Sequence, residues 1–343
     1  MIKVNRLKRG ATIGIVSPSW SGPNAFPLVY ETGIKNLQNS FDFKIKEFKS
    51  TRAAYDSGID YVLKRVEDVH AAFLDKEVDA IFLSIGGDDS IRLLPHLKPE
   101  ILLSNPKIVM GFSDSTNLLI YLNKLGIPSF HGPSVMAGFA EPEGLPKELI
   151  EHFESFFFAS WNNYKYPVYT EWTEDRSGWS DPEFLKRRKK YQANSKYRII
   201  NKGVSSSGRL LGGCIEIIEM LKGTDFGITN TDWADTTFFF ETSEDKPSVD
   251  YVKCALRSYG VAGAWGKVKN VIIGKSRGYS DTEYADLENI VKKVIVDEFG
   301  CKDVAIVSNY DIGHTQPIHI LPLGCNAILD ESLNLVLIES PFK

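Results

Sequence analysis

The sequence of 343 residues is poor in cysteine and in histidine, and neither sign of charge dominates it. Its four cysteines lie far apart without a C-x-x-C pair, which indicates neither a disulfide framework nor a zinc knuckle. Reduced thiols in the cytoplasm are therefore expected. The 40 Lys and Arg residues nearly balance 44 Asp and Glu residues, a composition that disfavours a nucleic-acid-binding protein. No apolar run approaches the roughly 18 residues of a membrane-spanning helix, so we expect a soluble protein without a membrane partner.

Length and hydrophobic content predict two folded domains, because a domain averages about 150 residues. In the first 130 residues, short β-branched runs alternate with helical patterns such as the one through 62–73. Because these runs are apolar almost throughout, they predict an α/β domain with a Rossmann-like parallel sheet. The expected strands are 12–16, 43–48, 80–85 and 108–112.

The pattern of expected strands and helices changes twice along the chain. We therefore predict an N-terminal α/β domain at 1–160, a connecting segment at 161–202 and a C-terminal domain at 203–343. The connecting segment combines aromatic residues with a cationic run at 186–190. It either closes over a ligand or is a solvated charged helix with a few packed aromatics. The C-terminal domain is expected to be mixed α+β. Its expected helices are 214–221, 248–259 and 284–299, and its expected strands are 237–240, 268–273, 304–307, 327–329 and 335–338.

Ser113 lies where the buried strand at 108–112 runs through a turn into an apolar helix. Such an elbow displays a serine hydroxyl above a sheet and points the backbone N–H of Asp114 toward a developing oxyanion. The hydrolase motif G-x-S-x-G is incomplete, since Ser115 occupies its last position. Ser113 is therefore a candidate nucleophile or a helix cap.

The glycine pair Gly86-Gly87 follows another expected strand. Its N–H groups could complete an oxyanion hole or cradle a phosphate, or the pair is simply a tight turn. It has neither the lysine of a P-loop nor the spacing of G-x-G-x-x-G, so no nucleotide cofactor is expected.

A serine nucleophile needs a base, and the sequence offers six histidines. His70 and His152 lie in charge-rich helical patterns and are expected to face solvent. His314 and His319 share a loop with two prolines, which would hold an imidazole still, as a general base requires. The two remaining histidines are His96, in a proline-flanked segment, and His131, which follows an expected strand.

Glu241 ends the aromatic run at 238–240 and is expected to be partly buried. A buried carboxylate is costly unless it accepts strong hydrogen bonds, and an imidazole N–H is a suitable donor. Glu244 and Asp245, in the following turn, are expected to face water. Ser113, Glu241 and His314 are one plausible triad among several.

Six motifs taken together resemble the serine LD-carboxypeptidase family, which also contains the microcin C immunity peptidases. The resemblance covers nearly the whole chain. The motifs are Gly10–Ser19, Arg65–Phe73 ahead of Gly86-Gly87, Gly111–Thr116, Gly208–Gly213, Phe240–Glu244 and Gly313–Gly324.

The resemblance implies a serine peptidase in which Ser113 is the nucleophile, His314 the base and Glu241 its orienting carboxylate, without a metal or other cofactor. It also implies an oxyanion hole formed by the N–H groups of Gly87 and Asp114. It further implies a C-terminal domain of barrel-like, swivelling character, an active site between the domains, and a homodimer.

The substrate implied by the resemblance is a small peptide or a peptidyl-nucleotide. The former would be a muropeptide cut at an LD bond, and the latter a compound of the microcin C type. The turn at 85–90 and the segment 240–244 are more similar to the immunity branch. Asp88, Trp179 and Tyr197 are the candidate substrate-binding residues, with Trp172 a further aromatic of the same segment. The alternative is a non-catalytic binding protein on the same scaffold.

Overall fold

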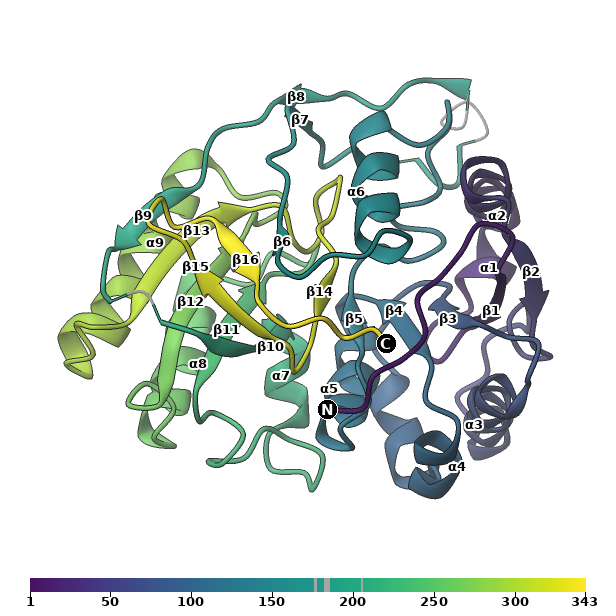
Figure 1. Cartoon of the computed structure of the whole chain (residues 1–343), viewed down its shortest axis with the longest axis horizontal. Coiled ribbons are helices and arrows are strands. Elements are labelled where there is room, and N and C mark those ends of the chain that lie inside the picture. The colour runs from purple at the N-terminus through teal and green to yellow at the C-terminus, as the bar shows by residue number, and fades with distance from the viewer. Residues whose placement is uncertain (176–177, 182–185, 205) are drawn as a thin grey trace.

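The computed structural model describes residues 1–175, 178–181, 186–204 and 206–343, and places most of its strands in two large sheets (Figure 1). The connecting segment expected at 161–202 therefore lies partly outside the described residues. The first sheet has the order β14-β5-β4-β3-β1-β2, and all of its neighbours are parallel except β14 and β5. Its strands are β1 (Thr12–Val16), β2 (Lys44–Glu47), β3 (Ala80–Leu83), β4 (Ile108–Gly111), β5 (Phe130–His131) and β14 (Leu321–Pro322).

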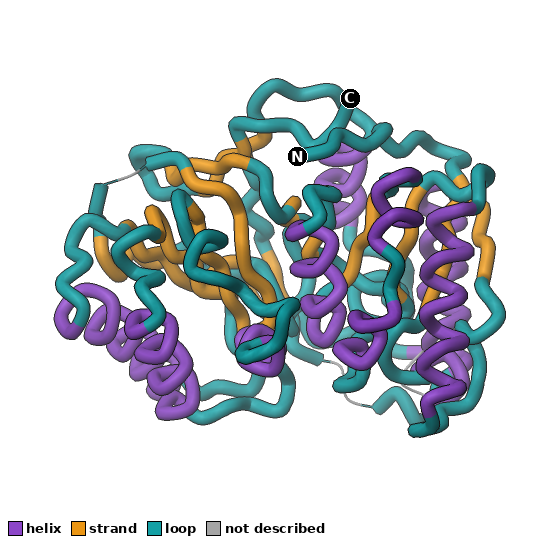
Figure 2. The backbone as a smooth tube through the Cα atoms, turned by 90° about the horizontal axis from the view of Figure 1, so that it is seen from below, coloured by secondary structure: helices purple, strands orange, loops and turns teal. Residues whose placement is uncertain are grey.

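Helices flank the strands of this half (Figure 2). Because the sheet is covered, every residue of β3 and β4 is buried, which explains why these strands are continuous apolar runs in the sequence. The helices are α1 (Gly22–Ala25), α2 (Pro27–Phe41), α3 (Ile59–Leu74), α4 (Pro99–Ser104), α5 (Thr116–Lys124) and α6 (Lys147–Phe157), with short 3-10 turns η1 (Ser90–His96) and η2 (Ser113–Ser115).

The second sheet has the order β6-β16-β15-β10-β11-β12-β13-β9, with β6 and β9 at its edges. Its centre is parallel and consists of β10 (Gly208–Cys214), β11 (Thr236–Glu241), β12 (Val268–Gly274) and β13 (Ala305–Tyr310). Antiparallel strands flank this centre, namely β6 (Tyr164–Lys165), β9 (Arg198–Asn201), β15 (Asn326–Leu329) and β16 (Leu335–Leu337). The helical connections are α7 (Ile215–Leu221), α8 (Val249–Val261) and α9 (Asp281–Lys292), which continues into the π-helical η4 (Lys293–Glu298). A separate pair comprises β7 (Glu171–Trp172) and β8 (Gln192–Ala193).

The two halves exchange strands. β14 comes from the C-terminal part of the chain yet joins the first sheet, and β6, at the start of the connecting segment, joins the second. The chain ends also meet, because Val4 N–H donates to the Pro341 carbonyl and Lys343 N–H to the Val4 carbonyl (Figures 1 and 2). The domain boundaries given above stay a prediction.

The predicted α/β class and the parallel N-terminal sheet are confirmed, and the strand β10 was not predicted. The solvent-facing positions expected of His70 and His152 are wrong. His152 is a buried residue of α6 that packs against the aromatic side chains around Tyr164, and His70 Nε2 accepts a hydrogen bond from the Lys98 N–H. Among the described helices, none is long and apolar enough to cross a membrane.

Candidate active site

Ser113 occupies a tight elbow between β4 and α5, at the edge of the first sheet where its parallel strands have their carboxyl ends. Its φ is +61°, a left-handed conformation that costs a residue with a side chain about 1 to 3 kcal/mol. Asp114 is fully buried behind it, where its carboxylate accepts hydrogen bonds from the Ser90 N–H (2.8 Å) and from Asn117 Nδ2 (2.9 Å). The hydrogen bonds of Asp114 therefore hold the strained Ser113 backbone in the conformation that exposes its hydroxyl.

The glycine turn after β3 lies directly against this elbow. A methyl group on Gly86 would stand 2.9 Å from Ser113 Oγ and 3.3 Å from the Asp114 nitrogen, so a side chain cannot be accommodated there. In the described ranges, neither the Gly87 N–H nor the Asp114 N–H donates to another group of the chain. Both N–H groups are thus available as donors, one in the turn beside the Ser113 elbow and one directly after Ser113 in the chain.

A buried ion pair fixes the glycine turn from behind. The Arg65 guanidinium, 1% exposed, donates to the Ser19 carbonyl (2.7 Å) and to the Asp89 carboxylate (2.5 Å). It thereby ties the loop after β1 to the loop after β3. This contact acts on the position of the turn, since Asp89 does not line the cavity around Ser113.

Glu241 and His314 approach Ser113 from the second sheet. Glu241 is the last residue of β11 and is fully buried, and His314 follows β13 and is 1% exposed. Gly313, with a φ of +93°, precedes the histidine, and a methyl group there would collide with the Glu241 carboxylate. Only glycine therefore allows the imidazole and the carboxylate to come so close.

The three side chains form one continuous chain of hydrogen bonds. His314 Nε2 lies 3.0 Å from Ser113 Oγ, and His314 Nδ1 lies 2.6 Å from Glu241 Oε2. Burial raises the pKa of Glu241, and the facing imidazole opposes that rise. Burial also disfavours the charged form of His314, but Glu241 and Glu244 outweigh it and raise the pKa of this histidine to about 9.

Glu244 makes a contact that the sequence did not indicate. Its side chain is 53% exposed, yet its Oε2 lies 2.8 Å from His314 Nε2, the same nitrogen that faces Ser113. The expectation that Glu244 faces water is therefore only half correct. Because the turn at 242–246 folds back on itself, sequence spacing alone could not show which direction this carboxylate takes.

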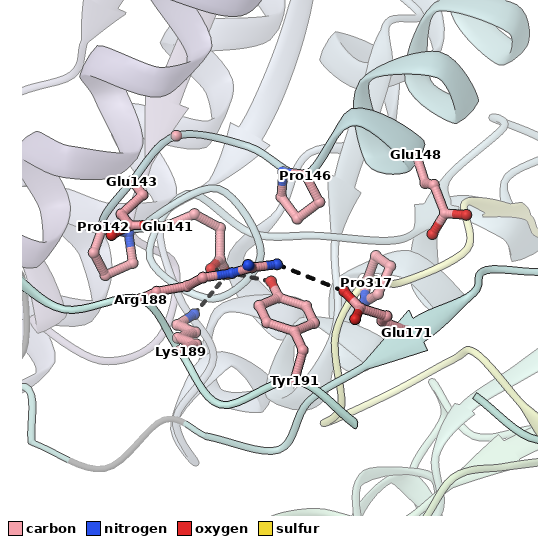
Figure 3. Close-up of a pocket in the computed structure, with 11 residues that line it drawn as sticks. Glu141, Pro142, Glu143, Pro146, Glu148, Glu171, Arg188, Lys189, Tyr191 and Pro317 are labelled. Atoms are coloured by element: carbon pink, nitrogen blue, oxygen red, sulfur yellow. Dashed lines mark hydrogen bonds and ion pairs between the residues drawn. The ribbon is translucent and has the colours of Figure 1, made fainter. Parts of the chain in front are cut away.

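The loop that carries His314 is held by the connecting segment. Gln316 and Thr173 exchange two backbone hydrogen bonds of 2.8 Å. The Lys189 ammonium, 4% exposed on its side chain, pairs with Glu141 at 2.6 Å and donates to Gln316 Oε1 at 2.8 Å. This pair borders a cavity of about 190 Å³. Figure 3 shows Tyr191 beside the pair and Arg188 reaching toward Glu171. The connecting segment therefore supports the base from behind.

A cavity of about 260 Å³ opens over Ser113. Trp179 lines it, as does the candidate oxyanion turn, and the walls also include Trp20, Glu244 and Arg277. The structure does not bring the other candidate substrate-binding residues to this cavity. Asp88 is exposed outside it, and Tyr197 stacks on Tyr310 with ring centroids 3.7 Å apart.

Trp172 lines a different cavity, near Lys275. Trp20 and Arg277 were missed because neither belongs to a motif that predicts a site. Trp20 lies in the loop after β1 and Arg277 in the loop after β12, so both follow strand ends, where sites form in α/β sheets.

The other histidines near the site are packed groups. His131 lies in β5 against Phe112 and Phe239, and burial lowers its pKa to about 3. His319 Nε2 bonds the Pro167 carbonyl at 2.9 Å, and burial likewise lowers its pKa to about 3. Of the two histidines in the proline-rich loop, only His314 faces Ser113. Over the described ranges, no group of three or more His, Cys, Asp or Glu side chains could hold a metal ion.

Two family models match the chain, the LD-carboxypeptidase N-terminal domain over residues 13–132 and the LD-carboxypeptidase C-terminal domain over residues 207–329. A predicted carboxypeptidase of Treponema pallidum is 30% identical over 264 residues, covering 76% of this chain and 72% of the relative. The microcin C7 self-immunity protein MccF of Escherichia coli is 26% identical, covering 94% of this chain and 91% of the relative. A solved MccF-like protein from Streptococcus pneumoniae in complex with AMP is 26% identical with a TM-score of 0.84, covering 96% of this chain and 99% of that one.

Proposed function

This chain belongs to the LD-carboxypeptidase family of peptidases, and on that basis we propose that it hydrolyses an amide with Ser113 as nucleophile, His314 as general base and Glu241 as the orienting carboxylate. The observation that carries the proposal is the continuous chain of contacts, 3.0 Å from Ser113 Oγ to His314 Nε2 and 2.6 Å from His314 Nδ1 to Glu241 Oε2. A nucleophile, a base and a third group that orients the base are what covalent catalysis by serine requires.

In the first step, Ser113 Oγ attacks the carbonyl carbon of the scissile amide while its proton passes to His314 Nε2. The carbonyl oxygen becomes an oxyanion, which in this proposal the N–H groups of Gly87 and Asp114 stabilise. Glu241 stabilises the imidazolium that forms and keeps the Nδ1 proton on the far side of the ring. When the intermediate collapses, His314 gives its Nε2 proton to the leaving nitrogen, and an acyl-enzyme remains.

Water then completes the turnover. It enters the space that the leaving group vacates, His314 Nε2 takes one of its protons, and the resulting hydroxide attacks the acyl carbon. A second oxyanion forms in the same place, and its collapse returns the proton to Ser113 Oγ. Each step uses only side chains and backbone groups that already lie around the elbow.

We further propose that the cleaved bond lies next to a small C-terminal group, either the LD bond of a muropeptide or the bond that joins a peptidyl or aminoacyl group to a nucleotide. The Trp179 side chain in the wall of the cavity supports the second class, since an indole can stack on a nucleobase. The AMP bound to the similar protein from Streptococcus pneumoniae points the same way.

Incubation with a muropeptide tetrapeptide and a peptidyl-aminoacyl sulfamoyl nucleotide, analysed by mass spectrometry, tests the function and its substrate together. Release of the nucleotide moiety by the wild type but not by Ser113→Ala is the expected result. Release of terminal D-alanine alone would assign a cell-wall substrate instead. Absence of both products would favour the alternative of a non-catalytic binding protein on this scaffold.

The homodimer and the cytoplasmic location are proposals that rest on the family resemblance and on the reduced cysteines. All four thiols are free, and Cys214 and Cys325 are buried. Analytical ultracentrifugation of the purified chain would test the dimer, and a single species of about 38.5 kDa would contradict it.

A further inference from the structure

Nε2 of His314 has two neighbours that make incompatible demands. To act as a base it must be unprotonated and accept the Ser113 hydroxyl proton, across a contact of 3.0 Å. To bind the Glu244 carboxylate, at 2.8 Å, it must carry a proton, because a carboxylate can only accept hydrogen bonds. Both demands cannot be met at once. The contact with Glu244 therefore describes a histidine that is protonated and inactive as a base.

Resting on the function proposed above, we propose that Glu244 is a positioning residue which holds the base in its protonated form until substrate entry moves the carboxylate off Nε2. The Nε2 proton then passes to solvent, and the neutral imidazole can take the proton of Ser113. Glu244 and Ser113 line the same cavity, so a substrate bound over the nucleophile lies in the space that this carboxylate also borders.

Two contacts anchor the turn that carries Glu244, whose side chain lies half in solvent. Ser243 N–H donates to Glu216 Oε1 of α7 at 3.0 Å, and the Lys246 ammonium pairs with Glu283 of α9 at 2.9 Å. These contacts hold the turn on both sides of Glu244. The Glu244 side chain itself is 53% exposed, so it can change rotamer without disturbing the packed core.

The other charged groups around His314 cannot replace this effect. Glu241 is bound to Nδ1, on the opposite side of the ring, and stays there during catalysis. His131 packs near His314 but is neutral across the working range, because burial lowers its pKa to about 3. Arg277 lines the cavity as a cation and cannot act as a carboxylate, and the Glu216 carboxylate accepts hydrogen bonds from the N–H and hydroxyl of Ser243. Glu244 is thus the carboxylate whose departure changes the charge at Nε2.

The deciding experiment compares Glu244→Gln with the matched control Asp245→Asn, which removes the neighbouring exposed carboxylate. Nitrogen-15 NMR of histidine-labelled protein, with the His314 signal assigned through His314→Ala, follows the imidazole without any substrate. We expect the wild-type imidazolium to persist toward pH 9, the Glu244→Gln titration to fall by about one pH unit or more, and the control to follow the wild type. Coincident titrations of the wild type and Glu244→Gln would overturn the proposal.

Kinetics supply a second readout that a merely structural role would not give. In Glu244→Gln the acid limb of kcat/KM, which reports the free enzyme, should move to lower pH and raise kcat/KM at pH 7 by about tenfold. The kcat limb should stay in place, because substrate has already displaced Glu244 in the complex. An equal fall of kcat and kcat/KM would contradict the proposal and indicate a substrate contact.

Failure of this inference can be told apart from failure of the proposed function. If Ser113→Ala retained wild-type turnover, the serine mechanism would be wrong, while the NMR titration would still report whether Glu244 holds the proton on His314. If Ser113→Ala were inactive and the titration did not respond to Glu244→Gln, only the role of Glu244 would be wrong.

Discussion

The two halves of the site are built on different principles. On the side of the first sheet, Ser113 and the glycine turn are placed by backbone geometry, in which a left-handed residue and a close approach leave two N–H groups free. On the side of the second sheet, Glu241, Glu244 and His314 are placed as charges, and burial decides how strongly they act on one another. The first half should therefore lose activity when its nucleophilic atom or its backbone geometry is changed, and the second when its charges are changed.

The largest loss of activity is expected on the side of the first sheet, which we call the geometric half. Ser113→Ala removes the only atom that can form the acyl-enzyme, so turnover should fall on the order of 10⁵-fold. Because the methyl group fits the same space, the thermal midpoint should stay close to that of the wild type. Product formation followed by mass spectrometry and a thermal unfolding curve would test both statements. Wild-type turnover in this variant would remove Ser113 from the mechanism.

The next largest loss of activity is expected on the side of the second sheet, which we call the charged half. Glu241→Gln keeps the shape of the side chain but loses the charge that stabilises the imidazolium and fixes its tautomer, so kcat should fall roughly 10³- to 10⁴-fold. Asp245→Asn, which removes a nearby carboxylate outside the hydrogen-bonded chain, is the matched control and should leave kcat unchanged. Steady-state kinetics of both variants would decide. Equal rates in the two variants would mean that Glu241 does not orient the base.

A third change tests the support of the His314 loop. Lys189→Met leaves the buried Glu141 carboxylate without its cation, with the Tyr191 hydroxyl still donating to it, and the free energy of unfolding should fall by roughly 3 to 5 kcal/mol. Lys190→Met, at the neighbouring exposed position, should change it by less than about 0.5 kcal/mol. Urea denaturation measures both values. A similar loss in the two variants would show that the buried pair does not stabilise the loop.

The smallest expected effect is a change in the free energy of unfolding that reports the backbone strain at Ser113. Ser113→Gly relieves the left-handed conformation and should raise the free energy of unfolding by about 1 kcal/mol, while Ser113→Ala should not. Both variants should be inactive. If glycine gave no gain over alanine in the same denaturation experiment, the elbow would not be strained.

The sequence predicted the geometric half well because its signals are local. The buried strands 12–16 and 108–112 and the turn at Gly86-Gly87 each occupy one short segment, and the structure has them at those places within a few residues. Ser113 could be singled out from the pattern of its own strand, turn and helix. The identity of its partners could not, because Glu241 and His314 are 128 and 201 residues away along the chain.

The charged half was predicted as a set of alternatives that only the family resemblance reduced. Local pattern could not tell His314 from His319, since both lie in one loop, and only the fold turns one toward Ser113 and the other toward Pro167. The contact of Glu244 with His314 was not predicted for a similar reason, because the direction of the turn at 242–246 depends on distant contacts. His152 was misjudged because charged neighbours on its helix concealed a buried face.

Covalent labelling of Ser113 tests the central statement most directly, namely that the two halves meet to make one activated hydroxyl. The wild type, Ser113→Ala and Glu241→Gln would be treated with a serine-directed phosphonate and analysed by intact-mass and peptide mass spectrometry. We predict a single adduct on the peptide containing Ser113 in the wild type, none in Ser113→Ala and much slower labelling in Glu241→Gln. No labelling of the wild type, or an adduct that persists in Ser113→Ala, would contradict the account.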